Sequence, residues 1–114
     1  MEPVELFYEA TSKADQAFKE AIPEPMTVTD GTNTWKVDEG MCGFASVNIR
    51  PARGKFVKFL KDHSIGSPDG YLGGYTVYAR TGSQSYERNT AWAQAFAAVL
   101  NSEGLNATSH SRLD

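Results

Sequence analysis

Apolar residues recur at steps of three and four near the start of the chain and predict an amphipathic helix. We expect this helix over residues 3–22, because Pro3 suits a first turn while Pro23 and Pro25 cannot continue a helix. It is expected to pack on the core through one face. That face contains Val4, Phe7, Ala10, Ala14, Phe18 and Ala21.

Two short stretches rich in β-branched and aromatic residues follow, and they predict a hairpin. They cover residues 26–30, MTVTD, and residues 33–37, NTWKV. Gly31, Thr32 and Asn33 lie where the two stretches meet, and residues of these types favour tight turns. We therefore expect a two-stranded unit of modest length.

The rest of the chain alternates between strand and helix patterns. The stretch MCGFASVNI at residues 41–49 has apolar side chains at both odd and even positions, which predicts a central strand covered on both faces. Gly43 indicates that another element comes close to this strand, and Gly104 suits a left-handed helix cap. The further elements are expected at 52–63 (helix), 71–80 (strand), 85–103 (helix) and 105–109 (strand).

This order of elements predicts an α/β or α+β fold. An N-terminal helix and hairpin precede a core that runs strand, helix, strand, helix, strand. The chain has 114 residues, of which 40% are hydrophobic and 22% are charged, which suits one globular domain but not two ordinary ones. We expect a single domain over residues 1–114, with an acidic part at 1–40 and a basic part at 41–114.

The formal net charge of −3 is unevenly distributed. Residues 1–40 contain nine acidic side chains and three lysines, a balance of −6, whereas residues 41–114 contain eight basic and five acidic side chains, a balance of +3. The basic part suits a phosphate-bearing partner, and the acidic part disfavours the wrapping of duplex DNA. Attraction between the two parts, within the fold or between the subunits of a homo-oligomer, explains the asymmetry equally well.

The location of the protein is indicated by its cysteine content and its N-terminal residues. A single cysteine, Cys42, cannot form an internal disulfide. No apolar run approaches the ~20 residues that a membrane-spanning helix needs, and the first residues lack the basic and apolar regions of a secretory signal. We expect a cytoplasmic protein that does not engage a membrane.

Both strand-to-helix junctions of the second half are rich in hydrogen-bond donors. If the two strands are parallel, the junctions lie at the same edge of the sheet, where the first-turn amides of both helices point outward and attract anions. Arginine adds a bidentate grip on a phosphate or carboxylate. The candidate ligand-binding residues are Arg50 and Arg53 at the first junction and Arg80, Ser83, Ser85, Tyr86 and Arg88 at the second.

These junction residues also have a purely structural explanation. Ser83 or Ser85 can cap the following helix, and Arg88 can pair with a surface acid for about 0–1 kcal/mol. Neither junction matches a P-loop or a Gly-x-Gly-x-x-Gly pattern. Capping and anion binding are both open for this set.

Aromatic side chains offer surfaces on which a nucleobase can stack. Tyr75 and Val77 share one face of their strand while Thr76 and Tyr78 share the other, so at least one tyrosine is expected to be exposed. Tyr86, at the start of a helix, is the strongest stacking candidate. The other aromatic candidates are Tyr71, Trp35 and Trp92.

The sequence contains no complete catalytic or metal-binding motif. His63 and His110 are far apart in the chain, and Cys42 has no neighbouring base that would activate a thiol. We predict no metal ion, no cofactor and no catalytic residue, and we expect binding rather than catalysis.

Several segments resemble small uncharacterised proteins that are encoded by bacteriophages. The segments are MCGFASVNI, ARGKFVKFL, GGYTVYAR, QSYERNTAWAQAFAAVLN and the terminal SRLD, which together span residues 41–114. The resemblance implies no site residue, but it implies a class of function. Small phage accessory proteins frequently bind host factors and disable them, either by sequestering a nucleotide signal or by blocking a defence nuclease.

The leading hypothesis is a phage-type counter-defence protein of the host cytoplasm that binds and sequesters a small phosphorylated or nucleotide-type ligand without turnover. The ligand is expected at the shared edge of the two junctions, within one chain or between the subunits of an oligomer. The glycine-rich loop from Gly66 to Gly74 would close over it.

Two other functions fit the sequence. The protein can be an inhibitor that docks on a host defence protein, such as a nuclease, through its acidic first helix. It can also be a small hydrolase or nuclease that uses Glu87 with a bound cation. The acidic side chains expected to face outward on the first helix are Glu5, Glu9, Asp15 and Glu20.

Overall fold

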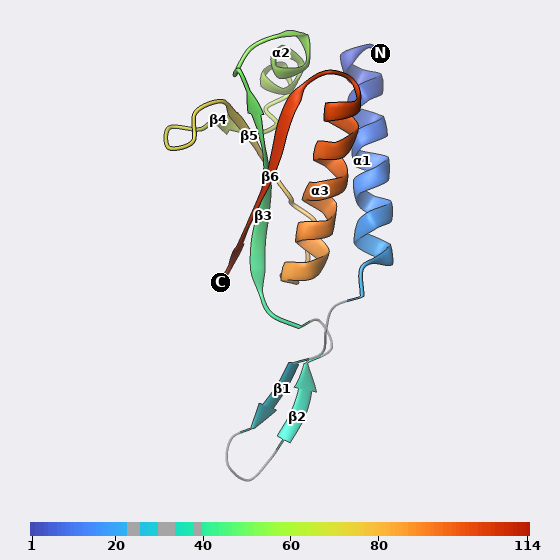
Figure 1. The fold of residues 1–114 in the computed structure, drawn as a ribbon, viewed down its shortest axis with the longest axis vertical. Helices are drawn as coiled ribbons and strands as arrows, with labels where there is room; N and C mark the ends of the chain where they lie inside the picture. The colour runs from blue at the N-terminus through green and yellow to red at the C-terminus, as the bar shows by residue number, and fades with distance from the viewer. Residues whose placement is uncertain (23–25, 30–33, 38–39) are drawn as a thin grey trace.

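The computed structural model describes residues 1–22, 26–29, 34–37 and 40–114, the two short middle segments by their backbone only (Figure 1). Its helices are α1 (Pro3–Glu20), α2 (Lys55–Asp62) and α3 (Tyr86–Ser102). Its strands are β1 (Met26–Thr29), β2 (Thr34–Val37), β3 (Gly43–Arg50), β4 (Ser67–Pro68), β5 (Tyr75–Tyr78) and β6 (Asn106–Leu113). None of the helices within these ranges is both long and apolar enough to cross a membrane.

The strands form two antiparallel sheets. β1 and β2 pair with each other, which confirms the predicted hairpin, although its turn residues Gly31, Thr32 and Asn33 lie outside the described residues. The main sheet has the order β4-β5-β3-β6, and every neighbouring pair in it is antiparallel. The fold is therefore α+β, and β5, α3 and β6 form a split β-α-β unit in which β3 lies between the two parallel strands.

All three helices lie on one face of the main sheet (Figure 1). α3 packs along the sheet, and α1 packs on α3. Trp92 and Phe96 stack at the centre of this layer with their ring centroids 4.9 Å apart, and the Trp92 Nε1 donates a hydrogen bond to the Asp15 carboxylate at 3.1 Å. The buried apolar residues are Leu6, Ala10, Ala14, Ala45, Val47, Ile49, Phe56, Val57, Leu60, Tyr75, Val77, Trp92, Ala93, Phe96, Ala97, Leu100 and Ala107.

The other face of the main sheet is uncovered over much of its area, which corrects one prediction. β3 is the predicted central strand, but Phe44 near its start is 52% exposed. Ala45, Val47 and Ile49 face the helices, whereas the side chains that alternate with them point to the open face. The strand is therefore covered on both faces only around Asn48, where the loop before β5 folds over it.

Two further predictions differ from the structure in detail. The buried face of α1 contains the predicted Ala10 and Ala14, with Phe7 and Phe18 partly buried against the core, but it also contains Leu6, while Val4 is 46% exposed. β6 extends to Leu113 because it pairs with β3 along the full length of that strand. Its polar residues gave no strand pattern after residue 109, since it is an edge strand with little buried surface.

The predicted close approach at Gly43 is confirmed. A Cβ atom there would lie 2.6 Å from the Tyr86 Cδ2 and 2.7 Å from the Arg112 carbonyl oxygen, distances that no side chain can occupy. Gly104 also has the predicted left-handed conformation, with φ at 88° directly after α3. Gly43 therefore allows α3 and β6 to lie tightly against β3, whereas Gly104 allows the left-handed turn between α3 and β6.

Candidate ligand-binding site

The two donor-rich junctions lie at opposite ends of the sheet, so they do not form the shared edge that parallel strands would give. β3 and β5 are antiparallel, with Ile49 opposite Tyr75 and Ser46 opposite Tyr78. The end of β3 is therefore beside the start of β5. Arg50 and Arg53 line a cavity at the α2 end of the molecule, while the second junction is at the other end.

The second junction uses its hydrogen-bond donors and acceptors internally. The Ser85 hydroxyl caps α3 by accepting a hydrogen bond from the Arg88 amide at 3.3 Å, and the Ser83 hydroxyl accepts one from the Ser85 amide at 3.0 Å. The buried Asn89 donates to the carbonyls of Gly43 and Ser83, both at 3.1 Å. The capping explanation therefore accounts for both serines.

Two other candidates of this junction are also held by the fold. The Arg88 Nη1 donates a hydrogen bond to the Phe18 carbonyl at 3.1 Å, and its guanidinium lies 5.6 Å from the Phe18 ring centroid, which ties α3 to the end of α1. Tyr86 packs over Gly43, and its hydroxyl lies 3.1 Å from the Ser111 hydroxyl. Tyr86 is thus a packing residue of the junction rather than an open stacking surface.

The open face of the main sheet carries aromatic, polar and basic side chains from three neighbouring strands. The antiparallel registers place Tyr78, Ser46 and His110 side by side across three strands. A hydrogen bond from the Ala79 amide to the Ala45 carbonyl continues the register beyond β5. The next row is therefore formed by Arg80, Phe44 and Arg112.

The residues of these rows other than Arg80 line a hollow of about 470 Å³ on the open face, which we call the sheet-face groove. Phe44 and Tyr78 are 52% and 51% exposed, and Tyr71 in the loop before β5 is 95% exposed. The Arg112 guanidinium lies over the Phe44 ring, 5.6 Å from its centroid. The lining residues are Phe44, Ala45, Ser46, Asp69, Tyr71, Leu72, Thr76, Tyr78, His110, Ser111 and Arg112.

A hydrogen-bonded carboxylate shapes one wall of the groove. The Asp69 Oδ1 accepts hydrogen bonds from the amides of Tyr71 and Leu72 at 2.9 and 2.8 Å, and its Oδ2 accepts one from the Thr76 hydroxyl at 2.8 Å. The Leu72 amide, the Thr76 hydroxyl and the Tyr71 amide, with His110 nearby, hold the pKa of the Asp69 carboxyl below its ordinary value of 3.8. Asp69 is therefore an anchor that ties the loop to the sheet.

His110 contributes a polar atom without a partner. Its Nε2 is shielded from solvent and has no hydrogen-bond partner among the described residues. Such atoms are uncommon in proteins, because a buried donor or acceptor without a partner costs free energy. A hydrogen bond from a ligand or from water would remove this cost.

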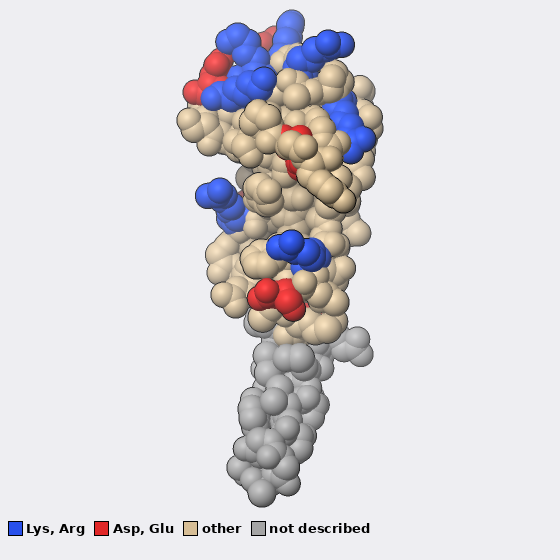
Figure 2. All heavy atoms as spheres, turned by 90° about the vertical axis from the view of Figure 1, so that its left-hand side faces the viewer, with Lys and Arg blue, Asp and Glu red and all other residues tan. Residues whose placement is uncertain are grey.

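Figure 2 looks onto the open face and shows how its charges are spread. A few separated basic side chains lie over the sheet, and a denser group of basic side chains lies at the end that contains α2. Over the described ranges, no cluster of three or more His, Cys, Asp or Glu side chains is arranged to hold a metal ion. The groove is thus a mostly neutral aromatic surface with cationic side chains at its margin.

The sequence predicted that at least one tyrosine of this strand would be exposed, and Tyr78 is exposed while Tyr75 is buried on the opposite face. The sequence analysis did not identify Phe44, His110 or Arg112 as site residues. A signal for Phe44 was present in the chain. Residues 44, 46, 48 and 50 are Phe, Ser, Asn and Arg, while the residues between them are Ala, Val and Ile, which is the alternation of a strand with one open face.

Comparisons with protein-family models, with characterised proteins and with solved structures gave no match for this chain. The resemblance to phage proteins thus stays a prediction. We therefore infer the function from the geometry of the groove and of the two ends of the sheet.

Proposed function

We propose that the protein binds a nucleotide-type ligand in the sheet-face groove and holds it without turnover. The observation that carries this proposal is the half-exposed pair of aromatic rings on the two central strands, Phe44 and Tyr78, with Arg112 over one of them. Nucleobases stack on exposed aromatic side chains, and a guanidinium can pair with the phosphate of the same nucleotide.

The positions of the two rings suit one or two bases. Tyr78 lies directly opposite Ser46, so it is the diagonal neighbour of Phe44 on the adjacent strand. Diagonal neighbours of this kind have Cα atoms about 7–8 Å apart, a separation that leaves room for flat groups on both rings. Arg112 and Arg80 lie at the register positions on either side of Phe44 and supply positive charge beside it.

The polar residues of the groove favour recognition over catalysis. Asp69 is the carboxylate of the groove, but both its oxygens already accept hydrogen bonds that hold the loop. Its lowered pKa also makes it a weak base. Retention of the ligand without conversion is the behaviour of a sequestering protein, which is the role that the resemblance to phage accessory proteins implies.

The proposal is tested by calorimetric titration of the protein with nucleoside monophosphates, cyclic dinucleotides and short single-stranded oligonucleotides. We expect one of these classes to bind, and we expect Phe44→Ala and Tyr78→Ala each to remove about 1–3 kcal/mol of binding free energy, the usual contribution of one stacked base. Chromatography of the recovered ligand should show no conversion.

Tyr8→Ala is the matched control, because Tyr8 is a 71% exposed tyrosine on α1, outside the lining of the groove. It should bind like the wild type. Since Phe44 and Tyr78 are half exposed, their replacement leaves no core cavity, and unchanged melting temperatures would show that the variants are folded. Absence of binding for all three ligand classes, or equal losses in Tyr8→Ala and Phe44→Ala, would contradict the proposal.

A further inference from the structure

A second cavity lies at the opposite end of β3 from Phe44 and does not belong to the groove. It has a volume of about 660 Å³ and is enclosed by the first turns of α1 and α2, the loop between β3 and α2, and the turn between α3 and β6. Small-molecule sites commonly have volumes of about 300–1,000 Å³. We call it the α2-end cavity.

The floor of the α2-end cavity is apolar. It is formed by Leu6 from α1, Ile49 from β3, and Phe56 and Val57 from α2, all of which are 5% exposed or less. Leu105, in the turn before β6, adds a partly buried apolar side chain. An apolar group that entered this cavity would therefore contact the edge of the hydrophobic core.

One wall of the cavity is cationic. Arg50 at the end of β3, Arg53 in the β3–α2 loop and Lys55 at the start of α2 line this wall. The side chains of Arg53 and Lys55 are exposed and make no hydrogen bond or ion pair with another residue in the described ranges. Their charges are therefore available to a ligand.

Arg50 is held in place rather than free in solvent. Its Nε donates a hydrogen bond to the Asn48 Oδ1 at 2.9 Å, and its side-chain stem lies so close to Gly74 that a Cβ atom there would be 2.8 Å from the Arg50 Cγ. These contacts hold the Arg50 side chain toward the open face of the sheet, so Arg53 and Lys55 are the cationic groups of this wall that a ligand would contact. The start of α2 adds a partial positive charge to the cationic wall, because Gly54 provides no capping side chain and the first turn contains no acid.

The cavity is also lined by two acidic side chains, neither of which forms an ion pair with Arg53 or Lys55 among the described residues. Glu2 lies at the start of α1, and Glu103 lies in the turn after α3, where its carboxylate is 3.8 Å from the Met1 amine. The cavity thus combines an apolar floor with basic side chains that have no acidic partner among the described residues. A ligand with one anionic head group on a short apolar body fits these two features.

We propose that the α2-end cavity is a second binding site, for small amphiphilic anions with a phosphate or carboxylate head. The head group would contact Arg53 and Lys55, and the apolar body would lie on Ile49 and Phe56. This inference is independent of nucleotide binding in the sheet-face groove.

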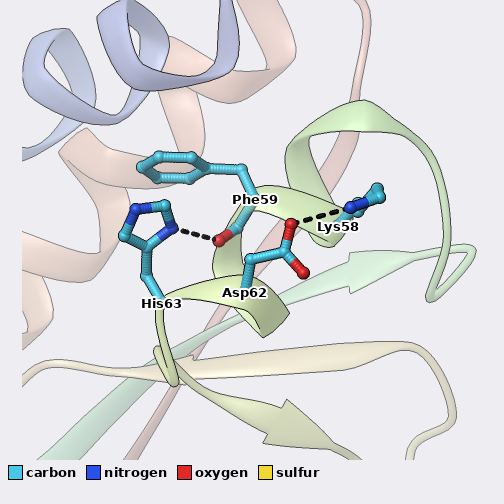
Figure 3. Close-up of polar contacts among 4 residues, drawn as sticks. All are labelled: Lys58, Phe59, Asp62 and His63. Carbon is cyan, nitrogen blue, oxygen red and sulfur yellow. Dashed lines mark hydrogen bonds and ion pairs between the residues drawn. The ribbon is translucent and has the colours of Figure 1, made fainter.

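The same helix offers a matched control, which Figure 3 shows. Lys58 lies one turn after the cationic wall, outside the α2-end cavity, and its Nζ is 2.8 Å from the Asp62 carboxylate. The charge of Lys58 is therefore already paired within α2. His63, after the end of α2, donates a separate hydrogen bond from Nδ1 to the Phe59 carbonyl at 2.8 Å.

The test is a nuclear magnetic resonance titration of the full chain with octyl phosphate and octanoate, both below their critical micelle concentrations, and with inorganic phosphate. We expect at least one amphiphile to shift the amide signals of Val57 and Leu105 and to bind more tightly than inorganic phosphate. The double variant Arg53→Gln/Lys55→Gln should bind it about tenfold more weakly, and Lys58→Gln should bind it like the wild type. Comparison of octyl phosphate with octanoate identifies the preferred head group.

Three results would overturn this proposal: no amphiphile shifts these signals, inorganic phosphate binds as tightly as octyl phosphate, or the double variant retains wild-type affinity. Because Arg53 and Lys55 are exposed, the double variant is expected to fold, and its melting temperature verifies this. Nucleotide binding measured on the same samples reports on the groove separately, so failure of one site is distinguishable from failure of the other.

Discussion

The Asn48 Nδ2 donates a hydrogen bond to the Thr76 hydroxyl at 3.1 Å, beneath the loop that precedes β5. The same amide group donates to the Gly73 carbonyl at 2.8 Å, and its oxygen accepts the Arg50 Nε. Thr76 in turn donates to Asp69. One buried side chain therefore connects the wall of the sheet-face groove to an arginine of the α2-end cavity.

Replacement of Asn48 is expected to weaken this connection. Asn48→Ala leaves the Gly73 carbonyl and the Arg50 Nε without their partner, and we expect a loss of about 1–3 kcal/mol in the free energy of unfolding, as for other buried hydrogen-bonding groups. Urea denaturation measures the change. Thr108→Ala is the control, since Thr108 lies opposite Asn48 on β6 and is exposed. A loss as large in Thr108→Ala as in Asn48→Ala would contradict this role for Asn48.

The lowered pKa of Asp69 predicts a pH dependence of stability. Because the folded-state pKa lies below the ordinary value of 3.8, the charged carboxylate stabilises the fold in full above that value. The contribution is lost as the pH falls through the folded-state pKa. Asp69→Asn should therefore lower the melting temperature at neutral pH, and the difference from the wild type should shrink on acidification below the ordinary value. A difference that stays constant over this range would exclude the charge as its cause.

The second junction is predicted to be sensitive to Asn89. Its amide holds the carbonyls of Gly43 and Ser83 and accepts a hydrogen bond from the Thr81 hydroxyl. Asn89→Ala would leave three buried or half-buried groups without partners, so we expect a loss of about 1–3 kcal/mol or more in the free energy of unfolding. Gln94→Ala on the exposed side of α3 should be nearly neutral. Chemical denaturation of both variants compares them directly.

The local patterns of the chain predicted the helices and strands well, but they did not predict strand direction. Pro3, the prolines after residue 22 and Gly104 mark helix ends through local geometry, and α1 and α3 begin or end within two residues of their predicted bounds. Strand pairing depends on residues far apart in sequence. Nothing local at Arg50 or Arg80 shows that β3 and β5 run in opposite directions. The sequence therefore could not show that the two junctions lie at opposite ends of the sheet.

The candidate site was predictable only in part, for a related reason. The parity of Tyr75 and Tyr78 correctly placed one tyrosine inside and one outside. The role of Phe44 in the groove depends on the residues that lie beside it on the neighbouring strands. Arg112 is one of them only because β6 pairs with β3 along its whole length. The polar sequence of β6 contains no periodic pattern that would predict such pairing.

The most direct test of nucleotide binding in the sheet-face groove is the response of its aromatic ring signals in a nuclear magnetic resonance titration with the nucleotide that binds in calorimetry. Stacking of a base on Phe44 and Tyr78 predicts upfield shifts of their ring protons, while the ring protons of Tyr8 stay unchanged. Ring protons of Phe44 and Tyr78 that do not move at saturation, while signals elsewhere do, would contradict the account.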